Sequence, residues 1–581
     1  MTPEHLQGNR HTLAHLLAAS VRALYPGAQN AIGPAIDNGF YQDFEIPVAI
    51  SDADLPKIEK KMREILKTWK TSEKREVTVE EAKKEFAWNI YKSQLIEEFA
   101  EGGKTLTFYT LGDFVDLCKG GHSENPVKDV SPDSFKLQRV AGAYWKNDAK
   151  NKMLTRIYGL AFATKADLDA YVTQLEEAKK RDHRKIGKEL KLFVFSELVG
   201  PGLPLWTPKG TIIRELLNDF VWSLRKPRGY QKVTIPHITK KDLYETSGHW
   251  AKYADDLFKI KTREKHIYAM KPMNCPHHTQ IYDSEQRSYR DLPQRYCETT
   301  MVYRDEQSGE LSGLSRVISI TQDDSHVFCR LSQIKQEVES VWQIVENFYA
   351  PFGFNLTPRL SIRDMKTPEK YLGVASNWDI AEQTLKGIIE AHTAKWIDGT
   401  GEAAFYGPKI DFMAHDSIGR EWQVATIQLD FVQPERFGLV CMNEKSEKEP
   451  IVMFHVAIMG SIERFMAIII EHFAGAFPVW LSPVQVAIVP VKEVHNEYAE
   501  MISKALSEKG VRVEIHSEND SIGKRINGAK AKKVPYVIVV GDKEKEAGVL
   551  TVETRAEKIE GITTEKFVEK IEKEIAERTL N

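Results

Sequence analysis

The chain has 581 residues and a formal net charge of −3, with 42% hydrophobic and 28% charged residues. This length predicts about three to five domains, each able to bury a core. No apolar run approaches the roughly 20 residues that span a bilayer, and the N-terminus lacks the pattern of a signal peptide. Five cysteines exclude a disulfide scaffold and indicate a reducing cytosol, while the slightly acidic charge excludes a basic nucleic-acid coat.

The first third of the chain contains two segments with different sequence patterns. Residues 1–164 mix short strands, such as 105–109, with charged helices, such as 55–69. Residues 165–191 read as one long polar helix that is rich in cations at its end. Such a helix is a connector between domains, and its cations either face solvent or contact RNA.

The remainder divides near residue 482. Between 192 and 481, Gly and Pro separate the strands, and strand–helix alternation is rare. This favours an antiparallel sheet with flanking helices. Between 482 and 581, the apolar runs 484–489 and 534–540 alternate with helical segments. That pattern indicates a small α/β domain with a partly parallel sheet.

Histidines and a cysteine recur at metal-like spacing near the N-terminus. His11 and His15 share one face of a helix, and Cys118 and His122 flank two glycines. By spacing alone these four side chains are a zinc ligand set. The first pair lacks the Glu of a zinc protease, and two unrelated surface histidines are the alternative.

Two arginines stand where an anion could bind. Arg304 follows a strand at 296–303 and precedes Asp305 and Glu306, and Arg464 opens an apolar helix at 465–473. Arg can hold a carboxylate or phosphate through two hydrogen bonds, and a cation at a helix start opposes the helix dipole. A surface ion pair with a nearby acid is the alternative for each. No local spacing links Cys275, His326 and His455, so spacing argues against a shared metal site.

Longer strings give a family resemblance that covers nearly the whole chain from Arg10. Together they resemble the bacterial threonyl-tRNA synthetases, which are class II aminoacyl-tRNA synthetases. The segment around Pro236 is similar to the first class II motif, which builds a dimer interface, and the Arg304 and Arg464 segments are similar to the second and third. The strings are AIGPAIDNGF at 31–40, AGAYW at 141–145, KPMNCP at 271–276, TQDDSH at 321–326, FYGPKID at 405–411 and QLD at 428–430.

The resemblance implies an α+β multidomain fold. The expected parts are an α+β editing domain at 1–164, a linker helix at 165–191, a class II catalytic domain with an antiparallel sheet at 192–481, and an α/β anticodon-binding domain at 482–581. The family's bacterial members usually begin with a small ubiquitin-like domain, which we expect this chain to lack.

In the family, a Cys and two His bind a catalytic zinc ion, and they match Cys275, His326 and His455. Three ligands leave an open position for the amino group and hydroxyl of threonine, which excludes valine. Asp324 and Gln428 match residues that help to hold threonine.

The resemblance also implies ATP chemistry, with Mg²⁺ bound to the nucleotide. Arg304 matches the arginine on the α-phosphate, Arg464 the arginine on the γ-phosphate, and Lys409 a lysine near the reacting carboxylate. The further positions expected to bind ATP are Glu306, Arg316 and Gln423.

Serine keeps the hydroxyl, and losing one methyl discriminates by only about 1–3 kcal/mol, so the resemblance implies a second, hydrolytic site. The editing residues that match are His11, His15, Lys92, Asp116, Cys118 and His122. The family favours a metal-free, water-activating site, and the zinc interpretation stays as the competitor.

Two positions depart from the family pattern: His277 replaces a Gly beside the metal loop, and Glu553 replaces an Arg that reads the anticodon. The expected tRNA contacts are a run of cations without an acid, namely Lys524, Arg525, Lys530, Lys532 and Lys533.

We therefore expect a homodimeric cytoplasmic enzyme, without a membrane segment, that joins L-threonine to tRNA(Thr) using ATP and edits seryl-tRNA(Thr). A non-catalytic RNA-binding relative is the alternative. A dead copy should lose the motif arginines or zinc ligands, and this chain keeps both.

Overall fold

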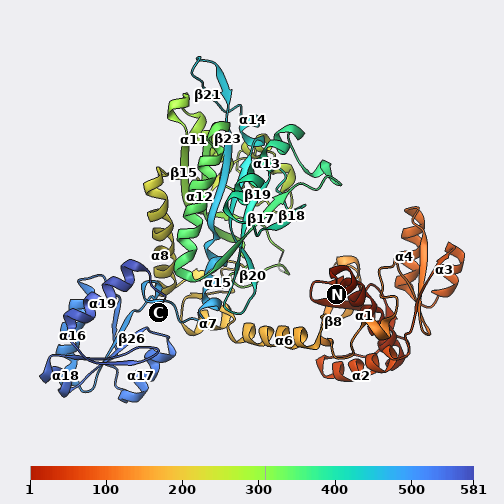
Figure 1. Ribbon diagram of the computed structural model, residues 1–581, viewed down its shortest axis with the longest axis horizontal. Helices are drawn as coiled ribbons and strands as arrows, with labels where there is room; N and C mark the ends of the chain where they lie inside the picture. The colour runs from red at the N-terminus through yellow and green to blue at the C-terminus, as the bar shows by residue number, and fades with distance from the viewer. Residues whose placement is uncertain (1, 149, 308, 581) are drawn as a thin grey trace. The chain divides into compact units, whose positions relative to one another are not determined.

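The computed structural model describes residues 2–148, 150–307 and 309–580 and divides into two compact units, 1–176 and 177–581 (Figure 1). Each unit contains its own sheets and its own buried hydrophobic clusters. Within the described ranges, no helix is long and apolar enough to cross a membrane.

The first unit is built around helix α1 (Pro3–Leu24), whose apolar face packs on α2 (Leu55–Leu66) and on a five-stranded sheet. The helix begins after Thr2, whose hydroxyl accepts a hydrogen bond from the His5 N–H. A second, three-stranded sheet carries α3 (Val79–Glu85) and α4 (Ile90–Glu101). The strands are β1 (Gln29–Asn30), β2 (Ala35–Ile36), β3 (Gly39–Glu45), β7 (Phe135–Tyr144) and β8 (Met153–Ala161) in the first sheet, and β4 (Ser72–Val77), β5 (Leu106–Leu111) and β6 (Phe114–Leu117) in the second.

The single helix predicted over 165–191 is wrong. The structure has α6 (Lys165–Lys180) and a separate α7 (His183–Glu189). Asp182 caps the second helix, because its side chain accepts the Arg184 N–H at 2.8 Å. Asp is a favoured N-cap, so this residue ends one helix and starts the next.

The antiparallel sheet predicted between residues 192 and 481 is confirmed. An eight-stranded sheet runs in the order β11-β15-β16-β23-β20-β19-β17-β18, with two parallel pairs, β11–β15 and β17–β18, at its edges. Four helices accompany it: α8 (Pro208–Arg225), α12 (Ile334–Tyr349), α13 (Ala375–His392) and α15 (Ile462–His472). The strands are β11 (Gln231–Lys232), β15 (Gln294–Tyr303), β16 (Ser319–Cys329), β17 (Asn355–Ile362), β18 (Ile397–Thr400), β19 (Lys409–His415), β20 (Glu421–Asp430) and β23 (Val452–Ser461).

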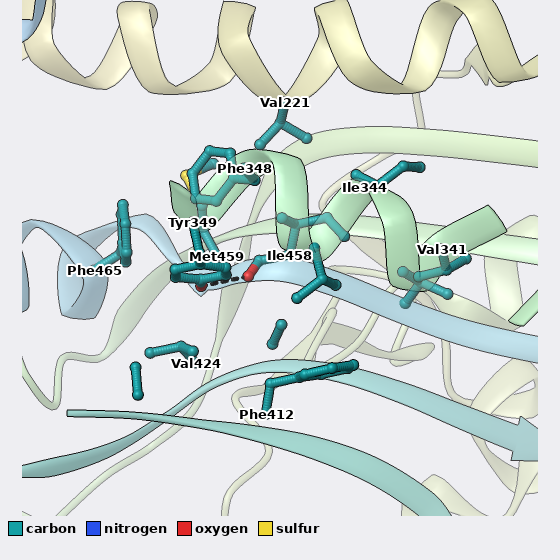
Figure 2. Packing of buried hydrophobic residues seen from close by; sticks show 14 of the residues in the cluster. Val221, Val341, Ile344, Phe348, Tyr349, Phe412, Val424, Ile458, Met459 and Phe465 are labelled. Carbon is teal, nitrogen blue, oxygen red and sulfur yellow. Dashed lines mark hydrogen bonds between the residues drawn. The ribbon is translucent and has the colours of Figure 1, made fainter. Parts of the chain in front are cut away.

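The core between these helices and the sheet is dense and apolar (Figure 2). Phe348 of α12 lies beside Val221 of α8, and Phe412 and Val424 reach up from the strands. Within this packing the Tyr349 hydroxyl donates a hydrogen bond to the Ile458 carbonyl at 2.7 Å, drawn as a dashed line in Figure 2. This packing keeps the sheet rigid beneath the site.

Smaller elements surround this sheet. They are β9 (Phe193–Val194) with β10 (Leu205–Trp206), β12 (Ile238–Lys240) with β13 (Lys259–Lys261) and β14 (Ile267–Met270), β21 (Val440–Met442) with β22 (Lys448–Pro450), and helices α9 (Lys241–Ser247), α10 (His249–Lys252), α11 (Cys275–Asp283) and α14 (Val432–Arg436).

The C-terminal region is the expected α/β fold with a partly parallel sheet. Strand β24 pairs in parallel with β25 and β26, whereas β27 and β28 continue antiparallel. The elements are β24 (Val486–Pro490), β25 (Val513–Ile515), β26 (Tyr536–Val540), β27 (Leu550–Glu553), β28 (Lys558–Ile562), α16 (Asn496–Ser507), α17 (Ile522–Ala531), α18 (Asp542–Ala547) and α19 (Thr564–Glu577).

Candidate active site

Strand register brings the distant trio together. His326 on β16 and His455 on β23 are direct partners across the ladder, and Cys275 is the first residue of α11. The three ligand atoms lie within 4.8 Å of one another, and all three side chains are buried. The sequence spacing argued against a shared site, but β16 pairs with β23, and this pairing places residues that are far apart in the sequence side by side.

Each imidazole of the trio has one nitrogen held by a neighbour. His455 Nε2 lies 2.8 Å from Asp430 Oδ2, and His326 Nδ1 lies 2.8 Å from His278 Nδ1. The opposite nitrogens face each other at 3.1 Å. Burial raises the pKa of the Cys275 thiol and lowers the pKa of His326, so both are neutral without a cation. One sulfur and two nitrogens with held outer nitrogens fit a three-ligand zinc site.

The residues expected to hold threonine lie against this trio. Asp324 Oδ1 is 3.9 Å from His326 Nε2, and Gln428 pairs with His455 across the sheet. Two neighbours that the residue assignments missed support them: Asn274 donates to Asp324 at 3.0 Å, and the Tyr406 hydroxyl donates to Gln428 at 3.0 Å. Asn274 and Tyr406 lie within the family motifs at 271–276 and 405–411, and these motifs were the sequence feature that could have identified them.

Neither motif arginine makes an ion pair with any residue that the structure describes. Arg304 follows β15, its Nε is buried without a partner, and its guanidinium lies 5.7 Å from the Tyr253 ring centre. Arg464 stands at the start of α15, where its backbone N–H donates to the Ser461 hydroxyl at 3.2 Å. The alternative of simple surface ion pairs is therefore absent from the described structure, and both cations are available to an anion.

The other predicted ATP residues are held in two clusters. Arg316 Nε donates to Glu306 at 2.8 Å within the β15–β16 loop. On the sheet, Asp411 is fully buried and accepts hydrogen bonds from Lys409 at 2.5 Å and from Gln423 at 2.8 Å. The further donors to Asp411 are Arg359 at 3.0 Å, Ser361 at 2.7 Å and Thr426 at 3.1 Å. Sequence reasoning missed Asp411 and Arg359.

The first unit assembles a second cluster from α1 and the loop after β6. Cys118 Sγ lies 3.4 Å from His11 Nε2 and 3.2 Å from His122 Nε2, and His15 is 4% exposed. They are thus not unrelated surface histidines. Beside them, Lys92 pairs with Asp116 at 2.7 Å.

Protonation in this second cluster is set by burial. Burial lowers the pKa values of His11, His15 and His122, and it raises the pKa of the Cys118 thiol to about 11. Neutral imidazoles can accept a proton from water, and they can also bind a metal ion. The four ligand atoms lie within 4.8 Å of one another, so this geometry serves both interpretations.

The predicted tRNA cations are mostly paired. Lys524 contacts Asp520 at 2.7 Å, Lys530 contacts Glu553 at 2.6 Å, and Lys532 lies 4.0 Å from Glu514. Arg525 donates to the carbonyls of Pro490 and His516. Lys533 makes no ion pair within the described ranges. The acids come from outside the cationic run or from just before it, and contact with tRNA stays a prediction.

The structure shows what surrounds the two residues that depart from the family pattern. His277 lies in α11 with its ring centre 6.2 Å from that of Tyr244, while its neighbour His278 contacts the trio. Glu553 is the partner of Lys530.

Three family models match the chain. They describe the tRNA synthetase class II core domain (G, H, P, S and T) at 258–473, an anticodon binding domain at 485–574, and the threonyl and alanyl tRNA synthetase second additional domain at 106–158. The threonine–tRNA ligase of Thermotoga maritima is 46% identical over 585 residues, covering 100% of this chain and 89% of that protein. That of Porphyromonas gingivalis is 47% identical over 580 residues, covering 97% and 87%.

A solved structure agrees with these matches. The RNA binding domain of threonyl-tRNA synthetase from Cryptosporidium parvum is 35% identical, with a TM-score of 0.64 over 68% of this chain and 98% of that one.

Proposed function

Because the chain belongs to the threonine–tRNA ligase family, we propose that a zinc ion held by Cys275, His326 and His455 selects its amino acid. The enzyme charges tRNA with threonine at the expense of ATP and edits mischarged product. The observation that carries the zinc assignment is the convergence of these three buried side chains across β16, β23 and α11. A zinc ion there would leave a position open for the threonine hydroxyl, which valine lacks.

Activation of threonine needs cations around two anions. An oxygen of the threonine carboxylate attacks the α-phosphorus, the bond to pyrophosphate breaks, and threonyl-adenylate forms. Arg304 and Arg464 stabilise the phosphate charge, Lys409 lies near the carboxylate, and Mg²⁺ accompanies the nucleotide. This role is supported by the lack of an ion pair to Arg304 or Arg464 among the described residues, and by the buried Arg304 Nε, which has no hydrogen-bond partner there.

The histidine cluster of the first unit hydrolyses seryl-tRNA(Thr). A neutral imidazole of His11 or His15 positions water and takes its proton as the oxygen attacks the serine ester carbonyl. The same proton passes to the tRNA 3′ oxygen as its bond to the carbonyl carbon breaks, which releases serine and the tRNA 3′ hydroxyl. The lowered pKa values of both rings support this role, since each keeps a free lone pair near neutral pH.

The assembly partners follow the same chemistry. The cationic run from Lys524 to Lys533 contacts the tRNA phosphates, and the enzyme works in the cytoplasm, where tRNA is charged. Two chains pair through the segment around Pro236, because this segment is similar to the class II motif that builds a dimer interface.

One assay tests the core of this proposal. The assay measures exchange between ATP and pyrophosphate in the presence of one amino acid at a time. Exchange should be fast with threonine, weak with serine and almost absent with valine. A protein that only binds RNA would give no exchange with any amino acid. Metal analysis of the same sample should find one zinc ion per chain.

A further inference from the structure

The described residues contain one more cluster of histidine and carboxylates, formed by Asp182, His183 and Glu471. His183 is 5% exposed at the start of α7, and Glu471 lies near the end of α15. The chemistry of activation and editing described above uses neither residue.

Hydrogen bonds fix the tautomer of His183. The Leu314 N–H donates to His183 Nε2 at 3.0 Å, so this nitrogen carries a lone pair. The proton of the neutral ring is then on Nδ1, which donates to Glu471 Oε1 at 2.6 Å. Both nitrogens are therefore in use, and Asp182 is occupied in capping α7. The cluster is a hydrogen-bonded link rather than a metal site.

The acceptor end of this link is firmly held. Glu471 Oε2 pairs with Arg420 at 2.6 Å, and Glu471 Oε1 also accepts the His183 backbone N–H at 3.0 Å. Because the carboxylate has partners on both oxygens, the imidazole cannot rotate without breaking the hydrogen bond to Leu314 or the one to Glu471.

The other end is the loop between β15 and β16, which carries Arg304, Glu306 and Arg316. Leu314 is fully buried at the centre of a tight turn, in which the Ser312 N–H donates to the Arg316 carbonyl at 3.1 Å. Gly313 has φ +52°, and a Cβ placed there would come within 2.4 Å of His183 Nε2. The loop backbone thus rests directly on the imidazole.

We propose that His183 is a positioning residue for ATP, because it anchors the loop that presents Glu306 and Arg316 to the nucleotide. The proposal rests on the proposed ATP-binding role of those two residues. A loop held in its binding conformation loses less entropy when the ligand arrives. A buried Leu314 N–H without its acceptor would instead pull the loop toward solvent.

Two substitutions at His183 separate its two hydrogen bonds. The His183→Asn amide can still donate to Glu471 but is too short to reach Leu314. The His183→Gln carbonyl reaches the place of Nε2 and can accept the Leu314 N–H. In threonine-dependent ATP–pyrophosphate exchange, we expect His183→Asn to raise the KM for ATP by about tenfold. The KM for threonine and the zinc content should not change, and His183→Gln should restore most of the ATP affinity.

A second variant approaches the same contact from the loop. Gly313→Ala places a methyl against His183 Nε2 and should also raise the KM for ATP. Gly548→Ala is its matched control, since Gly548 has φ +63° but no atom within 4 Å of a Cβ. It carries similar backbone strain without the clash, so its KM for ATP should equal that of the wild type.

The outcomes distinguish this inference from the proposed function. If the KM for ATP is unchanged in both His183→Asn and Gly313→Ala, the inference is overturned while the ligase assignment stands. If His183→Gln and His183→Asn lose thermal stability equally and neither changes the KM for ATP, His183 is only structural. If the wild type shows no exchange, the proposed function itself fails.

Discussion

Asp430 Oδ2 lies 2.8 Å from His455 Nε2, and this contact decides which nitrogen of the ring faces the other two proposed zinc ligands. Asp430 is fully buried and accepts the backbone N–H groups of Val432 and Gln433, so it cannot swing away. A carboxylate on Nε2 makes that nitrogen the donor and leaves the Nδ1 lone pair for the metal ion.

This arrangement predicts that losing a ligand and losing the carboxylate that orients a ligand weaken zinc binding to different extents. Cys275→Ala should remove the zinc ion and threonine activation together, because a ligand is missing. Asp430→Asn keeps all three ligands but should weaken zinc binding by about 10–100-fold. Metal analysis after dialysis against a graded chelator measures both effects.

Cys329→Ala is the matched control, since Cys329 is also fully buried but lies outside the trio. It should keep one zinc ion per chain and normal activation. Full zinc content in Cys275→Ala would refute the site, and circular dichroism should show that this variant still folds, because the core does not depend on the metal.

Arg304→Ala should greatly slow the formation of threonyl-adenylate. Removing one preorganised cation from a reacting phosphate costs about 3–4 kcal/mol, or roughly 10²–10³ in rate. Single-turnover adenylate formation measures this loss, and Arg290→Ala is the control, since Arg290 is exposed and its guanidinium lies against the neighbouring Tyr289. A rate within about twofold of wild type would place Arg304 away from the phosphate.

Local patterns predicted the elements of this fold better than its contacts. Rare strand–helix alternation indicated the antiparallel sheet, and apolar runs that alternate with helical segments indicated the partly parallel one. Spacing could not bring His326 to His455, because their proximity depends on β16 pairing with a strand far along the chain. It also could not show that Lys530 meets Glu553, since the acid comes from β27.

In the linker the local sequence pattern itself gave a wrong element, since one helix was predicted where the structure has two. Residues 165–191 have a helical composition throughout, and this is why one helix was predicted. The break depends on the single side chain of Asp182, which satisfies a backbone N–H at the start of α7. A capping residue within a helical pattern is a weak signal beside the many residues that favour helix.

Replacing Lys530, Lys532 and Lys533 by Ala should weaken tRNA binding and leave threonine activation intact. Each lost phosphate contact lowers the slope of log affinity against log salt by roughly 0.7–0.9. Lys533→Ala alone should account for one such step, because Lys533 has no acidic partner among the described residues. Titrations of tRNA at several salt concentrations measure the slope.

A triple variant with the same charge change controls for net charge. This control replaces three exposed lysines of the same region, Lys504, Lys566 and Lys573. If the slope does not change in the variant of Lys530, Lys532 and Lys533, those lysines belong to a solvated face.

The editing rate should not fall at the pH where an ordinary histidine takes up a proton. Burial lowers the pKa of His11 below its ordinary value of 6.5, although carbonyls of Gly120 and Gly121 partly oppose this. The ring therefore stays neutral as the pH falls through 6.5, and deacylation of seryl-tRNA should stay constant there. The unfolded chain takes up the proton first, so this ring's contribution to stability is complete above pH 6.5 and declines below it. Deacylation rates and melting temperatures between about pH 5 and 8 test both statements; a rate already halved at pH 6.5 would contradict the first.

The double substitution His11→Ala, His15→Ala separates editing from activation. Both rings lie in the first unit, whereas Cys275, His326 and His455 lie in the second. Threonine activation and charging should therefore stay near normal, while seryl-tRNA(Thr) accumulates because the two imidazoles proposed to position the hydrolytic water are gone. Deacylation of preformed seryl-tRNA, measured together with metal content, decides between the two interpretations of the cluster.

A water-activating site predicts lost hydrolysis with one zinc ion per chain before and after the substitution. A structural zinc site at His11, His15, Cys118 and His122 predicts a second metal ion that disappears with the histidines, and a first unit that melts at lower temperature. Undiminished hydrolysis by the double variant would refute the editing role of both histidines.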